Sequence, residues 1–158
     1  MPVTSYIVAL GSNRRGRHGG PRDEVRAALA VIGGVQAVSR IHETAPLGPS
    51  IRRFANAVAA IETDEAPDDL LRRLKGIERA FGRRRGQRWA ARVVDLDIVL
   101  WSGGCWTSPT LTIPHRLYRA RRFVLAPLAE VAPRWRDPVT GRTALTLLHA
   151  VDRRRPCA

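Results

Sequence analysis

The sequence predicts one α+β domain in which strands and helices alternate along 158 residues. Short apolar, β-prone runs end in turn residues, and apolar residues recur at helical spacing after Pro21 and after Pro67. Hydrophobic residues make up 44% of the chain, which is ordinary for a globular fold. The length therefore suits a single domain, residues 1–158, with a core of its own.

Four strands are predicted from apolar runs that glycine, proline or polar residues interrupt. They cover residues 6–10, 35–41, 54–61 and 93–101. Four helices are predicted from apolar stripes, and the first two start at proline and end at glycine. They cover residues 21–32, 67–81, 121–132 and 143–151, while residues 107–114 are expected to be irregular or weakly extended. The order βαββαβ, followed by further helices, is typical of a ferredoxin-like core.

The strand over residues 93–101 is the clearest, because its side chains alternate in character. We expect one face to carry Val94, Leu96, Ile98 and Leu100, and the other to carry Asp95, Asp97 and Val99. Period two puts both aspartates on one face, about 6 to 7 Å apart at the backbone, where their oxygens can converge on divalent cations. A solvated strand face is the ordinary alternative.

A basic segment lies directly before this strand. It places five arginines around Trp89, namely Arg83, Arg84, Arg85, Arg88 and Arg92. An exposed charged surface would explain the arginines alone. Carboxylates that hold Mg²⁺ beside guanidinium groups that hold phosphate are what phosphoryl transfer requires, so the combination favours such a site. Mobile loops are expected over residues 14–20, 44–53 and 83–92, with a short basic tail over residues 152–158.

The overall charge also points to an anionic partner. The chain has 27 basic against 14 acidic residues, and all basic residues except Lys75 are arginines, whose planar donors suit nucleic acid or a nucleotide. The turn Gly11-Ser12-Asn13 matches neither a P-loop nor a dinucleotide-binding pattern, so a nucleotide would bind elsewhere. No membrane span, secretory signal or metal-type spacing around Cys105 and Cys157 is visible, and we expect a cytoplasmic protein.

Other candidate residues have an ordinary explanation beside a functional one. Phe54 and Phe123 suit a hydrophobic core, and Glu78 suits a solvated helix face. His115 is an isolated histidine near several arginines, where a phosphate contact is an alternative to a structural role. Asn56 is polar within a predicted strand, which favours recognition of an amide-like edge.

Seven segments of the chain have an order and spacing that is specific in combination. They are Tyr6–Asn13, Thr44–Pro49, Phe54–Asn56, Glu78–Arg92, Val94–Ile98, Ile113–His115 and Arg121–Leu125. Together they resemble the 6-hydroxymethyl-7,8-dihydropterin pyrophosphokinase family of folate synthesis. The resemblance implies a ferredoxin-like three-layer sandwich, with helices on both faces of a central antiparallel sheet. It also implies transfer of the β,γ-pyrophosphoryl group of ATP to the pterin hydroxymethyl oxygen, which releases AMP.

The resemblance implies a role for each matching position. Asp95 and Asp97 would hold two Mg²⁺ ions, and Arg83, Arg92 and Asp97 would act in catalysis. ATP would be bound by Glu78, Arg85, Arg88, Trp89, Arg92, Ile98, Thr112, His115 and Arg121. The pterin would be bound by Thr44, Ala45, Pro46, Leu47, Phe54, Asn56, Trp89 and Phe123. A monomer that binds ATP and a pterin, but neither nucleic acid nor membrane, is expected.

Two alternatives remain open from the sequence. A paralogue would use the same metals and ATP on a different heteroaromatic alcohol, although Phe54, Asn56 and Phe123 favour the ordinary substrate. An RNA-binding module would suit the charge of +13 and the ferredoxin-like order of elements. Such a module requires aromatic residues on exposed strand faces, where this sequence instead places two carboxylates that repel phosphate unless a metal intervenes.

Overall fold

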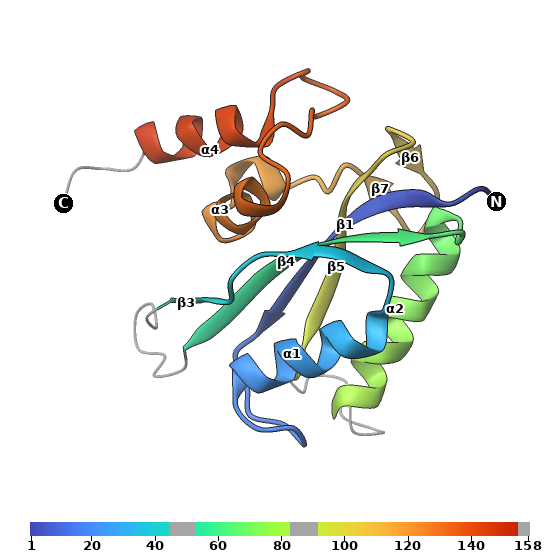
Figure 1. The fold of residues 1–158 in the computed structure, drawn as a ribbon, viewed down its shortest axis with the longest axis vertical. Helices are drawn as coiled ribbons and strands as arrows, with labels where there is room; N and C mark the ends of the chain where they lie inside the picture. Colours follow the sequence, from blue (N-terminus) through green and yellow to red (C-terminus); the bar gives the residue numbers. More distant parts are fainter. Residues whose placement is uncertain (45–52, 83–91, 155–158) are drawn as a thin grey trace.

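The computed structural model describes residues 1–44, 53–82 and 92–154, in which strands and helices alternate (Figure 1). The strands are β1 (Thr4–Ser12), β2 (Val35–Val38), β3 (His42–Thr44), β4 (Phe54–Thr63), β5 (Asp95–Trp101), β6 (Trp106–Thr107) and β7 (Thr112–Ile113). The helices are α1 (Pro21–Ile32), α2 (Pro67–Gly82), α3 (Arg122–Val131) and α4 (Ala144–Arg153), with a 3-10 turn at Tyr118–Ala120. The predicted α+β class and the predicted helices are confirmed.

The main sheet is antiparallel. Its strand order is β2-β4-β1-β5, and β3 pairs with β4 beside the end of β2. β1 is central and is covered on both faces, so consecutive residues Tyr6, Ile7 and Val8 are all fully buried. Strands β6 and β7 form a separate short hairpin.

Helices cover both faces of this sheet (Figure 1). On one face α1 and α2 pack through a cluster that includes Val25 and Leu74. On the other face α3 and α4 pack through a cluster that includes Leu125 and Leu147. The expected arrangement, an antiparallel sheet between two helical layers, is therefore observed. The end of the sheet that α3 and α4 leave uncovered carries the site described below.

Two stretches differ from the expected strands. The strand expected over residues 35–41 ends at Val38, and β3 (His42–Thr44) begins beyond that range as a separate strand. The Ser39 hydroxyl accepts the Val58 N–H at 3.0 Å and donates to the Arg40 carbonyl at 2.7 Å, so a side chain replaces part of the regular ladder. Residues 107–114, expected to be irregular or weakly extended, include Thr107 of β6 and all of β7, which pair with each other.

A bulge in β5 changes which side chains face α1 and α2. The register of the β1–β5 pairing shifts between Ile7 and Val8, which makes Val99 the extra residue. Ile98 packs in the cluster under α1 and α2, whereas Val99 and Leu100 both pack under α3 and α4. The prediction that Leu100 shares a face with Ile98 is therefore wrong, because strict alternation is broken at the bulge.

The segment before α1 is fastened to the body of the protein. Gly16 and Gly19 exchange backbone hydrogen bonds, and the His18 N–H donates to the Glu24 carboxylate at 2.7 Å. Glu24 is fully buried, and the His18 ring lies 4.8 Å from the ring of Phe81 near the end of α2. These contacts connect residues 14–20 to both helices of one layer, and the expected mobility of this loop stays a prediction.

The segment between α3 and α4 is tied down by Asp137, which is 1% exposed. Its carboxylate accepts hydrogen bonds from the Tyr118 hydroxyl (2.8 Å), the Val139 N–H (2.8 Å) and the Arg119 guanidinium. Burial alone would raise the pKa of Asp137, but these donors outweigh burial and lower the pKa to about 2. The carboxylate is thus ionised and holds three parts of the chain together.

Replacing Asp137 by asparagine is expected to lower the free energy of unfolding by about 2 kcal/mol at pH 7. The folded pKa lies below the ordinary value of 3.8, so the carboxylate stabilises the fold above that pH and the contribution is lost as the pH falls toward 2. Urea denaturation of both proteins between pH 7 and about pH 2.5 tests this. The difference in free energy of unfolding between the two proteins should shrink as the pH falls. A difference that stays constant would contradict the charge-based explanation.

Two further expectations concern compartment and cysteine chemistry. In the part of the chain that the structure describes, no helix combines the length and the apolar character needed to cross a membrane. Cys105 is an exposed free thiol, and Cys157 lies outside the described residues.

Candidate active site

A row of residues, one from each of four strands, crosses the uncovered end of the sheet. His42 of β3 pairs with Asn56 of β4, Asn56 pairs with Gly11 of β1, and Gly11 pairs with Asp95 of β5. Directly opposed residues on neighbouring strands face the same side of a sheet, and Asp97 follows on that face two residues along β5. Because Gly11 has no side chain, the middle of the row is hollow.

This row forms part of the lining of a cavity of about 790 Å³. Phe54 of β4 and Phe123 of α3 also line it, and they are 39% and 47% exposed. The core-packing explanation for these two rings is therefore wrong. The Arg121 guanidinium lies 5.5 Å from the centroid of the Phe123 ring, so the start of α3 adds a ring and a cation to the cavity. Two exposed rings around a hollow floor suit a flat heterocycle.

A second cavity of about 570 Å³ adjoins the first. Its lining includes Ile98, Thr112 and His115, three of the residues predicted to bind ATP. Asp97 and His115 line both cavities, which places the junction at β5. Arg121, predicted on the nucleotide side, lines the larger cavity instead.

The two aspartates lie where period two in β5 predicted them. Asp97 is half-buried and Asp95 is exposed, and both line the larger cavity. Partial desolvation raises the pKa of Asp95, the Arg92 guanidinium lowers it and the Asp97 carboxylate raises it again, so that the net shift is upward. A bound cation would relieve this repulsion between carboxylates.

The donor set fits magnesium. Among residues 1–44, 53–82 and 92–154, no group of three or more His, Cys, Asp or Glu side chains is arranged to hold a metal ion. Mg²⁺ does not need one, because it is commonly held by one or two carboxylates together with substrate phosphates and water. Asp95 and Asp97 supply the two carboxylates.

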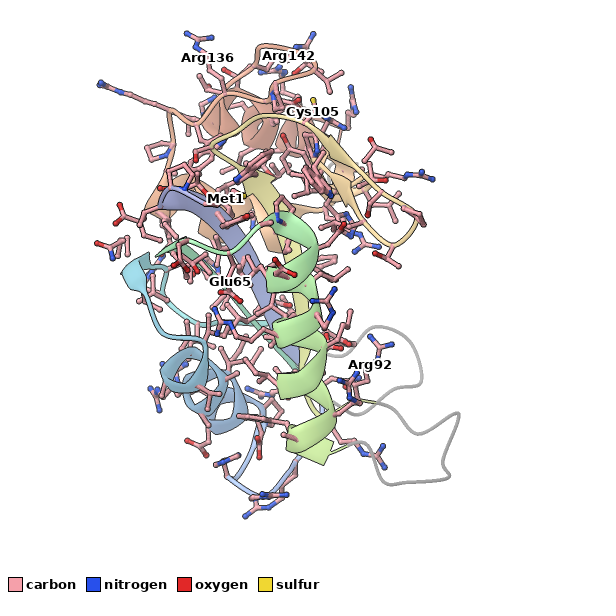
Figure 2. All side chains as sticks on the ribbon, turned by 90° about the vertical axis from the view of Figure 1, so that its right-hand side faces the viewer. Met1, Glu65, Arg92, Cys105, Arg136 and Arg142 are labelled. Atoms are coloured by element: carbon pink, nitrogen blue, oxygen red, sulfur yellow. The ribbon has the colours of Figure 1, made fainter. Side chains whose placement is uncertain are left out.

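Glu78 of α2 holds the backbone of β5 between these two aspartates. It is 4% exposed, and its carboxylate accepts the backbone N–H of Leu96, the residue between the two aspartates, at 2.8 Å. The Arg92 guanidinium lies 3.4 Å from Glu78 and 3.6 Å from Asp95, and Figure 2 shows Arg92 beside α2. The solvated-helix explanation for Glu78 is therefore wrong. A direct contact with ATP stays a prediction, since the described contacts make Glu78 a support for β5.

The bulge in β5 positions His115. The bulged Val99 carbonyl accepts the His115 backbone N–H at 3.0 Å. The Leu117 N–H donates to His115 Nδ1 at 3.1 Å, so a neutral ring carries its proton on Nε2. Burial lowers the pKa of His115, Asp97 raises it and Arg121 lowers it, with a net downward shift. At neutral pH His115 is therefore an uncharged N–H donor between the cavities.

Part of the predicted site lies outside the described residues. This part comprises Ala45, Pro46, Leu47, Arg83, Arg85, Arg88 and Trp89. Thr44 is the last residue of β3 and lines the larger cavity, as predicted for a pterin contact. Among the lining residues that were not predicted are His42 and Gly11. A glycine inside a strand pattern signals close approach of other atoms and could have indicated Gly11.

If the larger cavity binds the pterin that the resemblance implies, replacing Gly11 by alanine is expected to raise the KM for the pterin about tenfold with little change in the KM for ATP. A Cβ at position 11 would lie 3.0 Å from Asn56 Oδ1, so the amide must move from its place on the cavity floor. Steady-state kinetics with each substrate varied in turn measures the two KM values separately. Gly20→Ala, at a position with open space around it and an extended backbone that alanine can adopt, is the control for general effects of adding a methyl group. Equal losses for both substrates would contradict the proposed role of this space.

A sheet floor that carries two carboxylates, one of which lines both an aromatic cavity and an adjoining second cavity, suits a metal-dependent phosphoryl-transfer enzyme with separate acceptor and donor sites. Comparison with known proteins identifies the family. The family described as 7,8-dihydro-6-hydroxymethylpterin-pyrophosphokinase matches residues 7–133. The chain belongs to this family.

Relatives from several bacteria carry the same name, 2-amino-4-hydroxy-6-hydroxymethyldihydropteridine pyrophosphokinase. The protein from Pseudomonas aeruginosa is 44% identical over 154 residues, which cover 94% of this chain and 92% of that protein. The protein from Haemophilus influenzae is 40% identical over 136 residues, or 82% of each chain. The protein from Synechocystis is 34% identical over 151 residues, which cover 92% of this chain and 75% of that protein.

Solved structures share the fold at low sequence identity. Plasmodium falciparum HPPK-DHPS superposes with a TM-score of 0.73 at 14% identity over 94% of this chain and 41% of that chain. A second HPPK-DHPS, crystallised with substrates, gives a TM-score of 0.74 at 12% identity over 95% of this chain and 45% of that chain. This chain thus spans less than half of those structures. Neither the paralogue nor the RNA-binding alternative finds support in these comparisons.

Proposed function

We propose that Asp95 and Asp97 hold two magnesium ions with which this pyrophosphokinase transfers the β,γ-pyrophosphoryl group of ATP to the hydroxymethyl oxygen of 6-hydroxymethyl-7,8-dihydropterin. The observation that supports this most is that Asp97 lines both cavities. A carboxylate shared by two substrate sites lies where the transferred group must pass. Bound magnesium would neutralise the phosphate oxygens and align the attacking and leaving oxygens.

The larger cavity is the proposed pterin site. Phe54 and Phe123 would stack on the ring, and Asn56, which has a donor and an acceptor on one side chain, would pair with its amide edge. Thr44 would bind the pterin from the end of β3. Ala45, Pro46, Leu47 and Trp89 complete this proposal from outside the described residues.

The smaller cavity is the proposed nucleotide site, with Ile98 and Thr112 in its lining. His115 Nε2–H would donate to a phosphate oxygen near the junction without adding a charge. Arg121 would contact the transferred group from the pterin side, since it lines the larger cavity. Arg92 would stabilise the developing charge, with Arg83, Arg85 and Arg88 as further proposed phosphate contacts.

The finer features of the protein are also proposals. The strand order is β2-β4-β1-β5, and along the chain α1 connects β1 to β2 and α2 connects β4 to β5. Each helix thus links an inner strand to an outer one, which supports a ferredoxin-like core. We also propose a monomer of one domain as the working unit. A cytoplasmic location is proposed as well, since ATP is available there.

The test is AMP release from MgATP, measured with and without 6-hydroxymethyl-7,8-dihydropterin and repeated with EDTA. We expect AMP only when both the pterin and the metal are present, together with an equal amount of pterin pyrophosphate. ADP as the product, or AMP release that does not depend on the pterin, would overturn the proposed reaction. Metal-dependent ATP binding without AMP would point to a different acceptor.

A further inference from the structure

One hydrogen-bonded pair of side chains on the wall of the larger cavity has no role in the proposed reaction. His42 lines the cavity and lies directly opposite Asn56 in the β3–β4 pairing, so both side chains face the same side of the sheet. The Nε2 atom of His42 is hydrogen-bonded to the Glu130 carboxylate, which comes from α3 on the far side of the cavity wall. The side chains of both residues are largely buried, at 27% and 28% exposed.

Glu130 is itself held in place. Its Oε1 atom accepts hydrogen bonds from the Arg40 backbone N–H and from Arg40 Nε, both at 3.2 Å. Burial would raise the pKa of Glu130, but the hydrogen bonds from His42 and Arg40 outweigh it and lower the pKa. Glu130 is therefore an ionised, multiply bonded anchor for the imidazole. Arg40 is exposed and the His42 and Glu130 side chains are only partly buried, so we expect these contacts to orient the imidazole rather than to add much stability.

The pair joins the two walls that carry the aromatic rings. β3 leads to Thr44 and pairs with the strand of Phe54, and α3 begins beside Phe123. The contact between His42 and Glu130 therefore joins β3 to the last turn of α3, the opposite end of the helix from Phe123. The contact also determines which ring nitrogen of His42 is left over. An imidazole that donates its Nε2–H to a carboxylate keeps Nδ1 as its remaining polar atom, and in the neutral ring Nδ1 accepts a hydrogen bond.

We propose that His42, oriented by Glu130, is a specificity-determining residue of the acceptor site and selects, beside Asn56, heterocycles that carry an amino group next to a ring amide. This inference rests on the proposed function. An aminopyrimidinone edge has two adjacent N–H donors and one carbonyl. The Asn56 amide supplies a single acceptor, so it can pair with only one of the two donors. A second acceptor on the neighbouring strand satisfies the remaining donor, and a heterocycle without the amino group gains nothing from it.

The experiment measures the dissociation constants of two probes for the full-length protein with a non-hydrolysable MgATP analogue present. The probes are 6-hydroxymethylpterin and its 2-desamino analogue. The variants are His42→Phe, which keeps a planar ring, and Glu130→Gln, which keeps the shape but removes the charge. The control is His149→Phe, the same substitution at an exposed position of α4 that lines neither cavity.

We expect His42→Phe and Glu130→Gln each to weaken 6-hydroxymethylpterin binding about tenfold and to leave the 2-desamino probe within about twofold. The double variant should lose no more than His42→Phe alone, because both changes remove one interaction. ATP binding and the His149→Phe control should match the wild type. Equal weakening of both probes, which a purely structural role predicts, would overturn the proposal, as would unchanged binding of 6-hydroxymethylpterin.

The two levels of inference fail in different ways. If the wild-type protein forms no AMP with the pterin, the proposed function is wrong and the selectivity of His42 loses its basis. If the wild type forms AMP and discriminates between the probes, but His42→Phe discriminates equally well, only the role of His42 is wrong. Measuring wild-type AMP release in the same preparations separates these results.

Discussion

Replacing Asp97 by alanine is expected to reduce kcat by about a thousandfold or more, because no other described side chain lines both cavities with a negative charge. The residue is half-buried on a strand face that opens into the cavity, so the loss of its carboxylate leaves the two hydrophobic clusters intact. We therefore expect the free energy of unfolding to change by about 1 kcal/mol at most. AMP release at saturating ATP and pterin, over a range of Mg²⁺ concentrations, measures the effect.

Asp64→Ala is the matched control for this variant. Asp64 is an exposed carboxylate between β4 and α2 that lines neither cavity, so the substitution makes the same change in net charge away from the junction. Its kcat should equal that of the wild type. Asp97→Ala with kcat within tenfold of the wild type at saturating Mg²⁺ would remove Asp97 from the proposed metal site. Partial recovery at high Mg²⁺ would still support it, since a weakened site fills at higher metal concentration.

Local signals in the sequence predicted the helices well. Pro21 and Pro67 mark the starts of α1 and α2, and Gly33 and Gly82 mark their ends, because these residues favour or stop helical backbone through their own geometry. The apolar stripes between them form the face packed on the sheet. These signals depend on residues at most a few turns apart, so one sequence suffices to read them.

Long-range pairing could not be predicted in the same way. The bulge at Val99 exists only in the pairing of β5 with β1, and the break at Ser39 depends on the backbone of Val58. Neither leaves a signal in the local alternation of residues. The strand order is likewise a property of contacts between distant segments, which is why the element order indicated the fold class and not the register.

In the candidate site, too, features set by local geometry were predictable and features set by distant contacts were not. Asp95 and Asp97 share a face because of strand geometry alone, and the sequence predicted this. The burial of Glu78 and the pairing of His42 depend on partners from distant elements, the Leu96 N–H and Glu130. A sequence places a carboxylate on a helix, but whether it meets solvent or a strand N–H is decided by packing. The distant partners of these two residues are thus what sequence reasoning missed.

Replacing Arg92 by alanine is expected to reduce kcat by about a hundredfold or more while the KM for the pterin changes less than threefold. The guanidinium lies 3.4 Å from Glu78 and 3.6 Å from Asp95, so it connects the carboxylate that supports β5 to a carboxylate of the proposed metal site. Its removal leaves Glu78 paired with Lys75 alone among the described residues and withdraws a positive charge from the path of the transferred group. Single-turnover rates with each substrate saturating measure the chemical step directly.

Arg79→Ala and Arg92→Lys provide the controls for this prediction. Arg79 is an exposed arginine near the end of α2, and its loss should leave kcat unchanged because it lines neither cavity. A single Arg92 nitrogen, Nη1, lies near both Glu78 and Asp95, so a lysine ammonium could keep these contacts. Lysine lacks the planar fork with which arginine would bind the transferred group through two donors. We expect Arg92→Lys to recover only part of the rate. A full recovery would show that charge alone is needed, and a pure increase in the KM for the pterin in Arg92→Ala would contradict a role in the chemical step.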